Sequence, residues 1–242
     1  MIPKIIHYCW FGGKPMPELA LKCIESWKKF LPEYELRLWN EDTFDINSVP
    51  YAQEAYAAKK YAFVSDYVRL WALEREGGVY LDTDVEVLRS FDSLLDDTAF
   101  IGLEESLALL PCTCVMGCEA HCKWVKDMLR TYDNATFLRD DSSLDMTTNV
   151  QRLGVKMVEG GLKHERKIQY LPQWELRVYT HDYFSPITST RVMRKSKNTY
   201  CIHRFAGSWM DSKQSTWRNM WIIREGINVL VQLKRKFRTF TI

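Results

Sequence analysis

Residues 77–84 read GGVYLDTD, and this stretch decides both the fold class and the chemistry that we expect of the chain. The two glycines end a helical pattern, and an apolar strand predicted over 79–87 then presents Asp82 and Asp84. Because residues i and i+2 of a strand point to the same side, both carboxylates are predicted to face one point. Two converging carboxylates repel each other unless a proton or a metal ion lies between them. The pattern therefore indicates a site for a hard divalent cation, Mn²⁺ or Mg²⁺.

Strand and helix patterns alternate on both sides of this stretch. Helices are predicted over 18–30, 52–60, 62–76 and 122–132 and from 149 onward, and extended segments over 2–8, 34–39, 100–103, 170–179 and 199–203. The opening order of strand, loop, helix and strand favours an α/β fold in which helices cover the faces of a parallel sheet. In such folds ligands bind beyond the carboxyl ends of the strands, which is where the two aspartates stand.

The composition is that of an ordinary globular protein. Of the 242 residues 46% are hydrophobic and 26% are charged, and the net charge of +2 gives no polyanion signal, so we expect no nucleic-acid partner. The N-terminal run, interrupted by Pro3, Lys4 and His7, does not match a signal peptide, and no stretch approaches the roughly 20 apolar residues of a membrane span. The seven cysteines are odd in number, which favours reduced thiols in a cytoplasmic protein.

The helical pattern before the glycines carries Asp66 and Arg69, whose spacing of three residues places them on one helical face. As a functional pair, the carboxylate would bind sugar hydroxyls and the guanidinium would bind sugar or phosphate oxygens. The alternative is an ion pair exposed to solvent. His203, after a short predicted strand, and Trp10, beside two glycines at a strand end, have a similar alternative as residues of the core.

Three blocks of sequence, in order, carry a family resemblance. They are IHYCWFGG at 6–13; Ser65-Asp66 with Arg69, followed by GGVYLDTD at 77–84; and His203 with Gly207-Ser208-Trp209. With these blocks the chain resembles glycosyltransferase family 32, which includes initiating α-mannosyltransferases of yeast, capsule and lipopolysaccharide sugar transferases, and relatives of clostridial glucosylating toxins. The resemblance implies a single nucleotide-sugar-binding, Rossmann-like GT-A fold with a mixed central sheet. It also implies a divalent metal and sugar transfer with retention of anomeric configuration.

The resemblance further implies roles for particular residues. Trp10 would stack on the nucleotide base, and the donor-binding set would be His7, Trp10, Asp66, Arg69, Tyr80, Asp82, Ser208 and Trp209. Ser208 and Trp209 would form a lid over the diphosphate. The metal ligands would be Asp82, Asp84 and His203, with Asp84 as the principal ligand. Catalytic roles would fall to Asp82, Asp84 and Asn149, although many relatives carry a threonine-glycine-proline turn where this chain has Thr147-Thr148-Asn149.

These features predict a metal-dependent, retaining glycosyltransferase with a catalytic domain over 1–214 and an amphipathic, basic C-terminal helix over 215–242. The resemblance implies a nucleoside diphosphate hexose as the donor, and the breadth of the family favours UDP-galactose or UDP-glucose over GDP-mannose. The acceptor would be a saccharide of capsular polysaccharide or lipopolysaccharide, carried on a lipid pyrophosphate. The tail combines tryptophans with Lys234, Arg235 and Lys236, so we expect it to contact anionic lipid on the inner face of the cell membrane. A tail helix packed on the catalytic domain is the alternative.

Two other classes of protein fit parts of the pattern. Haloacid-dehalogenase-type phosphatases also place two aspartates one residue apart after an apolar strand, but the position that normally holds threonine or valine in them is Glu86 here. A non-enzymatic zinc or interaction module is suggested by the cluster Cys112, Cys114, Cys118, His121 and Cys122. The spacing of that cluster lacks the paired two-residue gaps of common zinc sites, which favours buried thiols in a strand and at a helix start.

Overall fold

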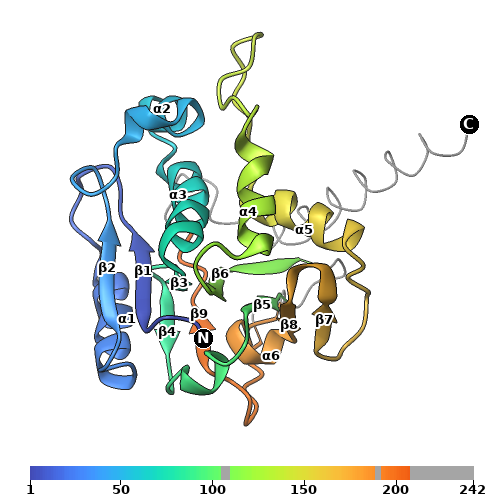
Figure 1. Ribbon diagram of the computed structural model, residues 1–242. Coiled ribbons are helices and arrows are strands. Elements are labelled where there is room, and N and C mark those ends of the chain that lie inside the picture. The colour runs from blue at the N-terminus through green and yellow to red at the C-terminus, as the bar shows by residue number, and fades with distance from the viewer. Residues whose placement is uncertain (105–109, 189–191, 208–242) are drawn as a thin grey trace, which may run out of the picture.

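The computed structural model describes residues 1–104, 110–188 and 192–207, and Figure 1 shows how their helices and strands are arranged. The helices are α1 (Glu18–Phe30), α2 (Pro50–Ala57), α3 (Tyr61–Glu76), α4 (Lys123–Leu129), α5 (Asn149–Glu159) and α6 (His181–Phe184). The strands are β1 (Ile5–Cys9), β2 (Glu35–Trp39), β3 (Gly78–Leu81), β4 (Val85–Val87), β5 (Ala99–Leu103), β6 (Pro111–Cys118), β7 (Gln169–Leu171), β8 (Leu176–Tyr179) and β9 (Cys201–His203).

Seven of these strands form one sheet in the order β2-β1-β3-β6-β5-β8-β7. The strands β2, β1 and β3 are parallel to one another, β6 is antiparallel to both β3 and β5, and β8 is parallel to β5. The expected mixed central sheet is therefore confirmed. Because β6 reverses the chain direction between its neighbours, the carboxyl ends of β1, β3 and β5 lie at the same edge of the sheet, where α/β folds bind ligands.

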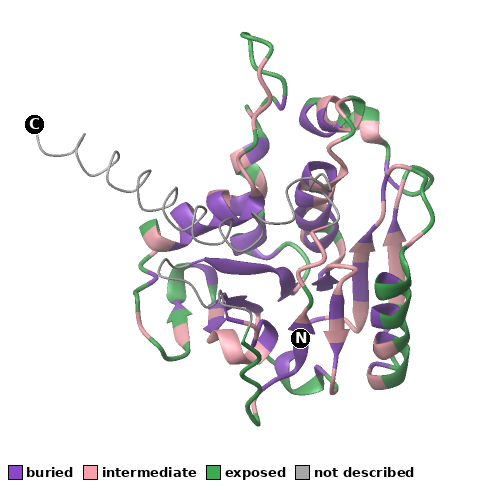
Figure 2. Ribbon diagram, turned by 180° about the vertical axis from the view of Figure 1, so that it is seen from behind, coloured by how far each residue is buried: buried purple, intermediate pink, exposed green. Residues whose placement is uncertain are grey.

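Two apolar cores cover the two faces of this sheet. One core packs α2, α3, α4 and α5 against one face, and the other packs α1 and α6 against the opposite face. Side chains alternate between them along β3, because Tyr80 enters the first core while Val79 and Leu81 enter the second. Figure 2 shows the result: the central strands are buried, whereas the outer side of α1 is exposed. The sheet is thus a rigid support for the residues at its edge.

The glycine pair acts as the sequence predicts. Gly77 (φ 65°) and Gly78 (φ 96°) both adopt positive φ angles between the end of α3 and the start of β3. A Cβ atom at Gly77 would lie 2.6 Å from the backbone nitrogen of Ala120, so a larger residue would clash there as well as strain the backbone. The turn therefore brings α3, which carries Asp66 and Arg69, directly alongside β3.

The single strand expected over 79–87 is wrong. β3 ends at Leu81 and β4 begins at Val85, and the turn between them is closed by the Val85 N–H, which donates to the Asp82 carbonyl oxygen at 3.0 Å. β4 then pairs with β9 in a separate two-stranded sheet, where Val85 lies opposite His203. A turn, and not the alternation of one strand, thus brings the two aspartates together. Because β4 leaves the main sheet and pairs with β9, His203 is brought next to the two aspartates.

Most other elements lie close to their predicted places. α1 has the predicted bounds, whereas the segment expected to be extended over 170–179 is divided by a 3₁₀ turn at 172–174. All seven cysteines are free and buried, and this agrees with the interpretation of buried thiols. Among the described residues no helix is long and apolar enough to cross a membrane. The predicted lid, Ser208-Trp209, and the predicted tail over 215–242 lie outside the described residues.

Candidate active site

A cavity of about 650 Å³ opens at the edge of the sheet where β1, β3 and β5 end. Each of these strands delivers a polar or aromatic residue into its lining, namely Trp10 after β1, Asp82 after β3 and Glu104 after β5. Helix α3 contributes Asp66 and Arg69, and Asn149 and His203 complete the polar lining. The cavity therefore collects most of the residues that the sequence singled out.

Three of these residues form a cluster with the geometry of a metal site. One ligand atom each from Asp82, Asp84 and His203 lies within 4.8 Å of the other two, and of the described residues this is the group of three so placed. His203 Nε2 lies 3.5 Å from Asp84 Oδ1. Two carboxylate oxygens and one imidazole nitrogen suit Mn²⁺ well and Mg²⁺ less well, because Mg²⁺ prefers oxygen ligands alone. The predicted ligand set is thus together in space, and it fits a divalent cation.

Asp84 and His203 each favour the ionised form of the other. Burial alone would raise the pKa of the Asp84 carboxyl, but the charge of His203 and the N–H of Ala206, which donates to Oδ2 at 2.7 Å, hold that pKa below its usual value. Burial alone would lower the pKa of His203, but Asp84 and Glu104 raise that pKa well above its usual value. A metal at Nε2 requires this nitrogen to be deprotonated, so metal and proton compete for one atom.

Arg69 is the main cation on the other side of the aspartates. Its Nη2 lies 3.1 Å from Asp66 Oδ1 and 3.2 Å from Asp82 Oδ1, and Nη1 donates to the carbonyl oxygen of Thr113 at 2.9 Å. The guanidinium also lies over the Tyr80 ring, 4.5 Å from its centroid, and the Tyr80 hydroxyl donates to Asp82 at 2.9 Å. Asp82 is therefore held by a cation of the protein itself, Arg69, as well as being a predicted metal ligand.

Asp66 is held from a second direction by the start of α5. The Asn149 N–H donates to Asp66 Oδ2 at 2.9 Å, and the Asn149 side-chain amide donates to the Asp66 carbonyl oxygen at 3.2 Å. Burial raises the pKa of Asp66 even though Arg69 and this N–H favour its ionised form. A helix N-terminus stabilises a nearby anion, so α5 helps to keep the carboxylate charged. Asn149 thus positions Asp66, and its Oδ1 atom remains buried without a hydrogen bond.

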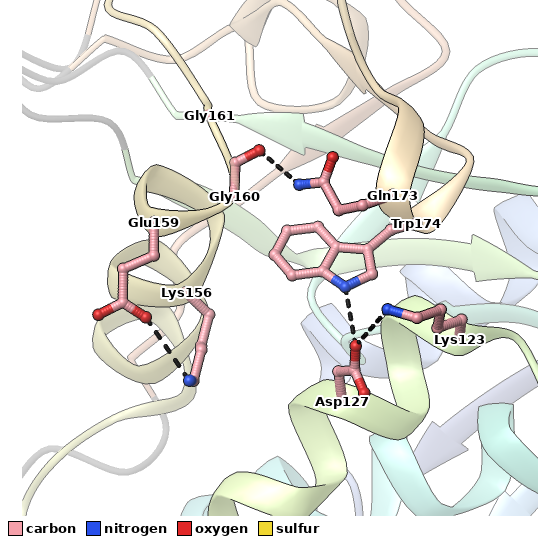
Figure 3. A pocket seen from close by; sticks show the side chains of 8 residues that line it. All are labelled: Lys123, Asp127, Lys156, Glu159, Gly160, Gly161, Gln173 and Trp174. Carbon is pink, nitrogen blue, oxygen red and sulfur yellow. Dashed lines mark hydrogen bonds and ion pairs between the residues drawn. The ribbon is translucent and has the colours of Figure 1, made fainter.

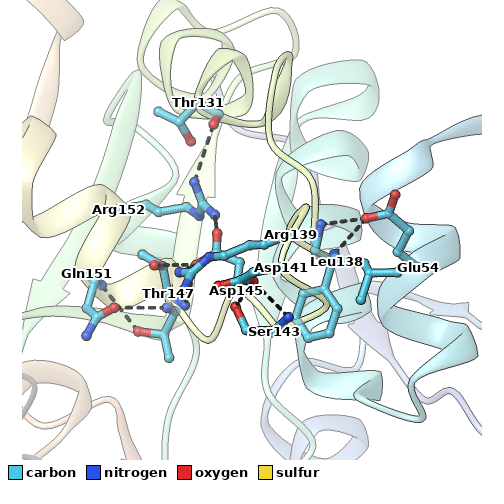
Figure 4. A network of polar contacts seen from close by, with 12 residues as sticks. Glu54, Thr131, Leu138, Arg139, Asp141, Ser143, Asp145, Thr147, Gln151 and Arg152 are labelled. Carbon is cyan, nitrogen blue, oxygen red and sulfur yellow. Dashed lines mark hydrogen bonds and ion pairs between the residues drawn. The ribbon is translucent and has the colours of Figure 1, made fainter.

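A polar network fixes the segment that leads into α5 (Figure 4). Asp145 accepts from Arg152 at 2.6 Å, from Arg139 at 2.9 Å and from the Thr147 hydroxyl at 2.7 Å. Glu54 of α2 accepts the backbone N–H groups of residues 137 and 138 at 2.7 and 2.8 Å. The segment over 137–145 is therefore tied to both α2 and α5. This anchoring holds the first residue of α5 against Asp66.

The two N-terminal candidates differ in their surroundings. Trp10 is half-buried in the cavity lining, and its indole N–H donates to the Lys14 carbonyl oxygen at 2.6 Å. His7 is fully buried outside that lining. Its Nδ1 accepts from the Trp39 indole N–H at 3.1 Å, so Nε2 carries the proton and donates to the Gly77 carbonyl oxygen at 2.8 Å. The structure therefore gives His7 a role in holding the glycine turn and does not bring it to the cavity.

Comparison with known proteins identifies the segment at the centre of this site. Residues 17–101 match the family described as the glycosyltransferase sugar-binding region containing a DXD motif. These residues are a DXD-type glycosyltransferase region. The region includes α1, α3 and the aspartate turn, and it favours the glycosyltransferase interpretation over the phosphatase and the zinc module.

Two curated relatives resemble the same part of the chain. Inositol phosphoceramide mannosyltransferase 3 of Schizosaccharomyces pombe is 34% identical over 104 residues, which cover 41% of this chain and 29% of the relative. A mannosyl phosphorylinositol ceramide synthase of Saccharomyces cerevisiae is 30% identical over 105 residues, which cover 42% of this chain and 28% of the relative. The chain therefore matches less than a third of the length of either relative.

The fold extends the likeness beyond the DXD region. A glycosyltransferase involved in the glycosylation of the major capsid of PBCV-1 superposes with a TM-score of 0.51 at 13% identity, over 90% of this chain and 99% of that one. At this identity the likeness concerns the fold alone. The expected single GT-A fold with its mixed central sheet is confirmed for the described residues.

Glu104 is the cavity residue that sequence reasoning missed. It follows the apolar strand β5 directly, as Asp82 follows β3, and this shared position is the signal that could have identified it. Three buried polar atoms in the cavity residues lack a hydrogen-bond partner, and they are Glu104 Oε2, Asn149 Oδ1 and His203 Nδ1. Buried polar atoms are normally satisfied, so these three indicate that a polar ligand belongs in the cavity.

A second cavity, of about 550 Å³, lies between α4, the end of α5 and the turn at 172–174 (Figure 3). Its polar groups pair with one another: Asp127 accepts from Lys123 at 2.9 Å and from the Trp174 indole at 3.0 Å. Lys156 and Glu159 form an ion pair at 3.5 Å. Because these groups satisfy each other, this cavity differs from the first one, whose lining residues include three buried polar atoms without a partner.

Proposed function

We propose that the protein is a metal-dependent glycosyltransferase that moves a hexose from a nucleoside diphosphate sugar to a saccharide acceptor. The observation that carries the proposal is the arrangement of Asp82, Asp84 and His203 at the edge of a cavity that also holds unpaired polar atoms. The match of residues 17–101 to a DXD sugar-binding region supports the same conclusion.

The proposed division of labour follows from the contacts. Asp82, Asp84 and His203 would hold the cation, which supplies Lewis-acid stabilisation of the charge that develops on the diphosphate leaving group. Asp66, held in place by Arg69 and the start of α5, would accept hydrogen bonds from donor-sugar hydroxyls. The N–H groups of Arg69 are largely used by protein oxygens. We therefore propose that Arg69 orients the two carboxylates and that it contributes less to direct binding of the sugar.

The donor is proposed to be a nucleoside diphosphate hexose. The breadth of the family that the chain resembles favours UDP-galactose or UDP-glucose, whereas the names of the two yeast relatives indicate mannose, so GDP-mannose belongs in the same test. Calorimetric titration of the purified protein with each of the three donors, in the presence of Mn²⁺, tests the proposal. One donor should bind more tightly with Mn²⁺ than with a chelator. Equal, weak heats from all three donors would contradict it.

Replacement of Trp10 by alanine is expected to weaken donor binding. Base stacking on an aromatic side chain contributes about 1–3 kcal/mol per base in single-stranded nucleic-acid complexes, so the donor KM should rise roughly 10-fold or more. Since stacking acts equally in the ground and transition states, kcat should fall less than KM rises. Steady-state kinetics measures both constants. The control is Tyr170→Ala, which removes an exposed aromatic side chain on β7. An unchanged KM in Trp10→Ala would contradict base stacking and would leave Trp10 with a structural role only.

Retention of configuration is proposed from the family resemblance. The sequence places no carboxylate as a covalent nucleophile, which favours front-face displacement through an oxocarbenium-like state. The coupling constant of the anomeric proton in the product, measured by NMR, distinguishes the outcomes. A product with the anomeric configuration of the donor supports the proposal, and an inverted product contradicts it.

We propose that the acceptor is held at a membrane and that residues 217–238 dock the enzyme there. The two relatives are named for ceramide-linked inositol phosphates, which are lipid acceptors. Replacing Lys234, Arg235 and Lys236 by glutamine should reduce binding to anionic liposomes about 100-fold, since each basic residue contributes about 1 kcal/mol near an anionic surface. Co-sedimentation measures this binding. The matched control replaces Lys163, Arg166 and Lys167, and a wild-type protein that does not pellet with anionic liposomes at low salt would contradict the proposal.

A further inference from the structure

Glu104 is a buried carboxylate whose ion-pair partner is a histidine. It is the first residue after β5, its side chain is 5% exposed, and its backbone N–H donates to the Leu110 carbonyl oxygen at 2.9 Å. Its Oε1 lies 3.7 Å from His203 Nδ1, and its Oε2 has no hydrogen-bond partner. A buried carboxylate is costly unless something nearby compensates for its charge. His203 is the group that provides this compensation.

His203 lies between two carboxylates and presents a different nitrogen to each. Nε2 faces Asp84 at 3.5 Å, and Nδ1 faces Glu104 at 3.7 Å. The ring is held in place by the pairing of His203 with Val85 and by the Phe205 ring, whose centroid is 4.0 Å away. Its orientation is therefore set from both sides. A cation shared with Asp84 would therefore bind at Nε2.

We propose that Glu104 is a positioning residue that keeps the proton of neutral His203 on Nδ1, so that the lone pair of Nε2 is free for the metal. The inference rests on the metal site of the proposed function. Histidines that bind metals almost always donate their other N–H to a carboxylate, a carbonyl or a water. The 3.7 Å separation is longer than a hydrogen bond, and we expect binding of a cation at Nε2 to close it. Oε2 has no partner, so no hydrogen bond at that oxygen holds the carboxylate back.

The test is the affinity for Mn²⁺ in the absence of nucleotide sugar, measured on the full chain from the electron paramagnetic resonance signal of free Mn²⁺. Glu104→Ala should weaken Mn²⁺ binding about 10- to 100-fold, the usual effect of losing such a carboxylate. Glu104→Gln keeps an acceptor oxygen for Nδ1–H, so its affinity should lie between those of wild type and Glu104→Ala. The control is Glu86→Gln, which removes a carboxylate bonded to Arg204, the residue next to His203.

A second readout separates positioning from a purely structural role. At a fixed, subsaturating Mg²⁺ concentration, long-range proton–nitrogen NMR spectra should show wild-type His203 protonated at Nδ1, and Glu104→Gln should show a mixture of tautomers because less of its His203 is bound to the ion. If Glu104→Ala does not fold, the glutamine variant decides the question by both measurements. Unchanged Mn²⁺ affinity and an unchanged tautomer in Glu104→Gln would overturn the inference. Neither measurement requires sugar transfer, so the inference and the proposed function can fail separately.

Discussion

Replacement of Asp84 by asparagine is expected to abolish sugar transfer while leaving the fold intact. The Asp84 carboxylate is 15% exposed and adjoins both His203 and the Ala206 N–H, so the amide fits the same space but loses the negative charge. A metal ion contributes several kcal/mol of charge stabilisation, so the loss of a principal ligand should reduce kcat roughly 1000-fold or more. Transfer and donor hydrolysis should fall together. Steady-state assays over a range of Mn²⁺ concentrations measure the change.

The matched control for this experiment is Asp97→Asn. Asp97 has a similar exposure of 13%, but it pairs with Arg177 and lies outside the lining of the active-site cavity. Its replacement should lower stability slightly and leave kcat unchanged. Circular dichroism should give wild-type spectra for both variants. Full activity of Asp84→Asn at ordinary Mn²⁺ concentrations would remove Asp84 from the site, and activity recovered only at high Mn²⁺ would agree with its role as a ligand.

Removal of the Arg69 side chain is the second large effect that we expect. The guanidinium is 6% exposed and bridges Asp66 and Asp82, so Arg69→Ala leaves two poorly solvated carboxylates without their shared cation. Breaking a buried ion pair from one side costs about 3–5 kcal/mol of unfolding free energy. Activity should also fall sharply, because both carboxylates line the active-site cavity. Urea unfolding and donor hydrolysis measure the two losses.

Lysine is not expected to rescue this position. Arg69 contacts Asp66, Asp82, Thr113 and Ser65 through its three nitrogens, and a lysine ammonium cannot reproduce that planar set of donors. Arg177→Ala, at an arginine that is 42% exposed and paired with Asp97, should cost only about 0–1 kcal/mol. Wild-type stability and activity in Arg69→Lys would show that a single positive charge suffices and would contradict the bridging role.

Much of the fold was predictable because its signals are local. The bounds of α1 follow from an apolar stripe. The turn after α3 follows from two consecutive glycines, because glycine adopts the positive φ angles of such a turn readily. The strand break between Leu81 and Val85 was not predictable in the same way. Apolar residues continue on both sides of the aspartates, so the pattern is that of one strand. The break depends on β4 finding β9, a partner more than a hundred residues away in the sequence.

The residues of the site likewise divide into those with a local sequence signal and those whose role depends on distant contacts. The metal ligands could be predicted because Asp82 and Asp84 are separated by a single residue and the family resemblance supplies His203. The environment of Arg69 could not, because its bond to the Thr113 carbonyl oxygen joins residues 44 positions apart. His7 belongs to a motif of the resemblance, yet only the tertiary structure reveals that both of its ring nitrogens are used by Trp39 and Gly77. Glu104 had a local signal, because it is a carboxylate directly after an apolar strand. Its function could not be predicted, because its partner His203 is distant in the sequence.

The most direct test of the central claim is the release of nucleoside diphosphate from a sugar donor by the purified full chain. Chromatography would follow UDP-glucose, UDP-galactose and GDP-mannose separately, with Mn²⁺, with a chelator, and with the chelator followed by excess Mn²⁺. The account predicts that at least one donor is cleaved with Mn²⁺, that chelation stops cleavage, and that added Mn²⁺ restores it. Cleavage that continues unchanged in the chelator, or no cleavage of any donor with Mn²⁺, would contradict the account.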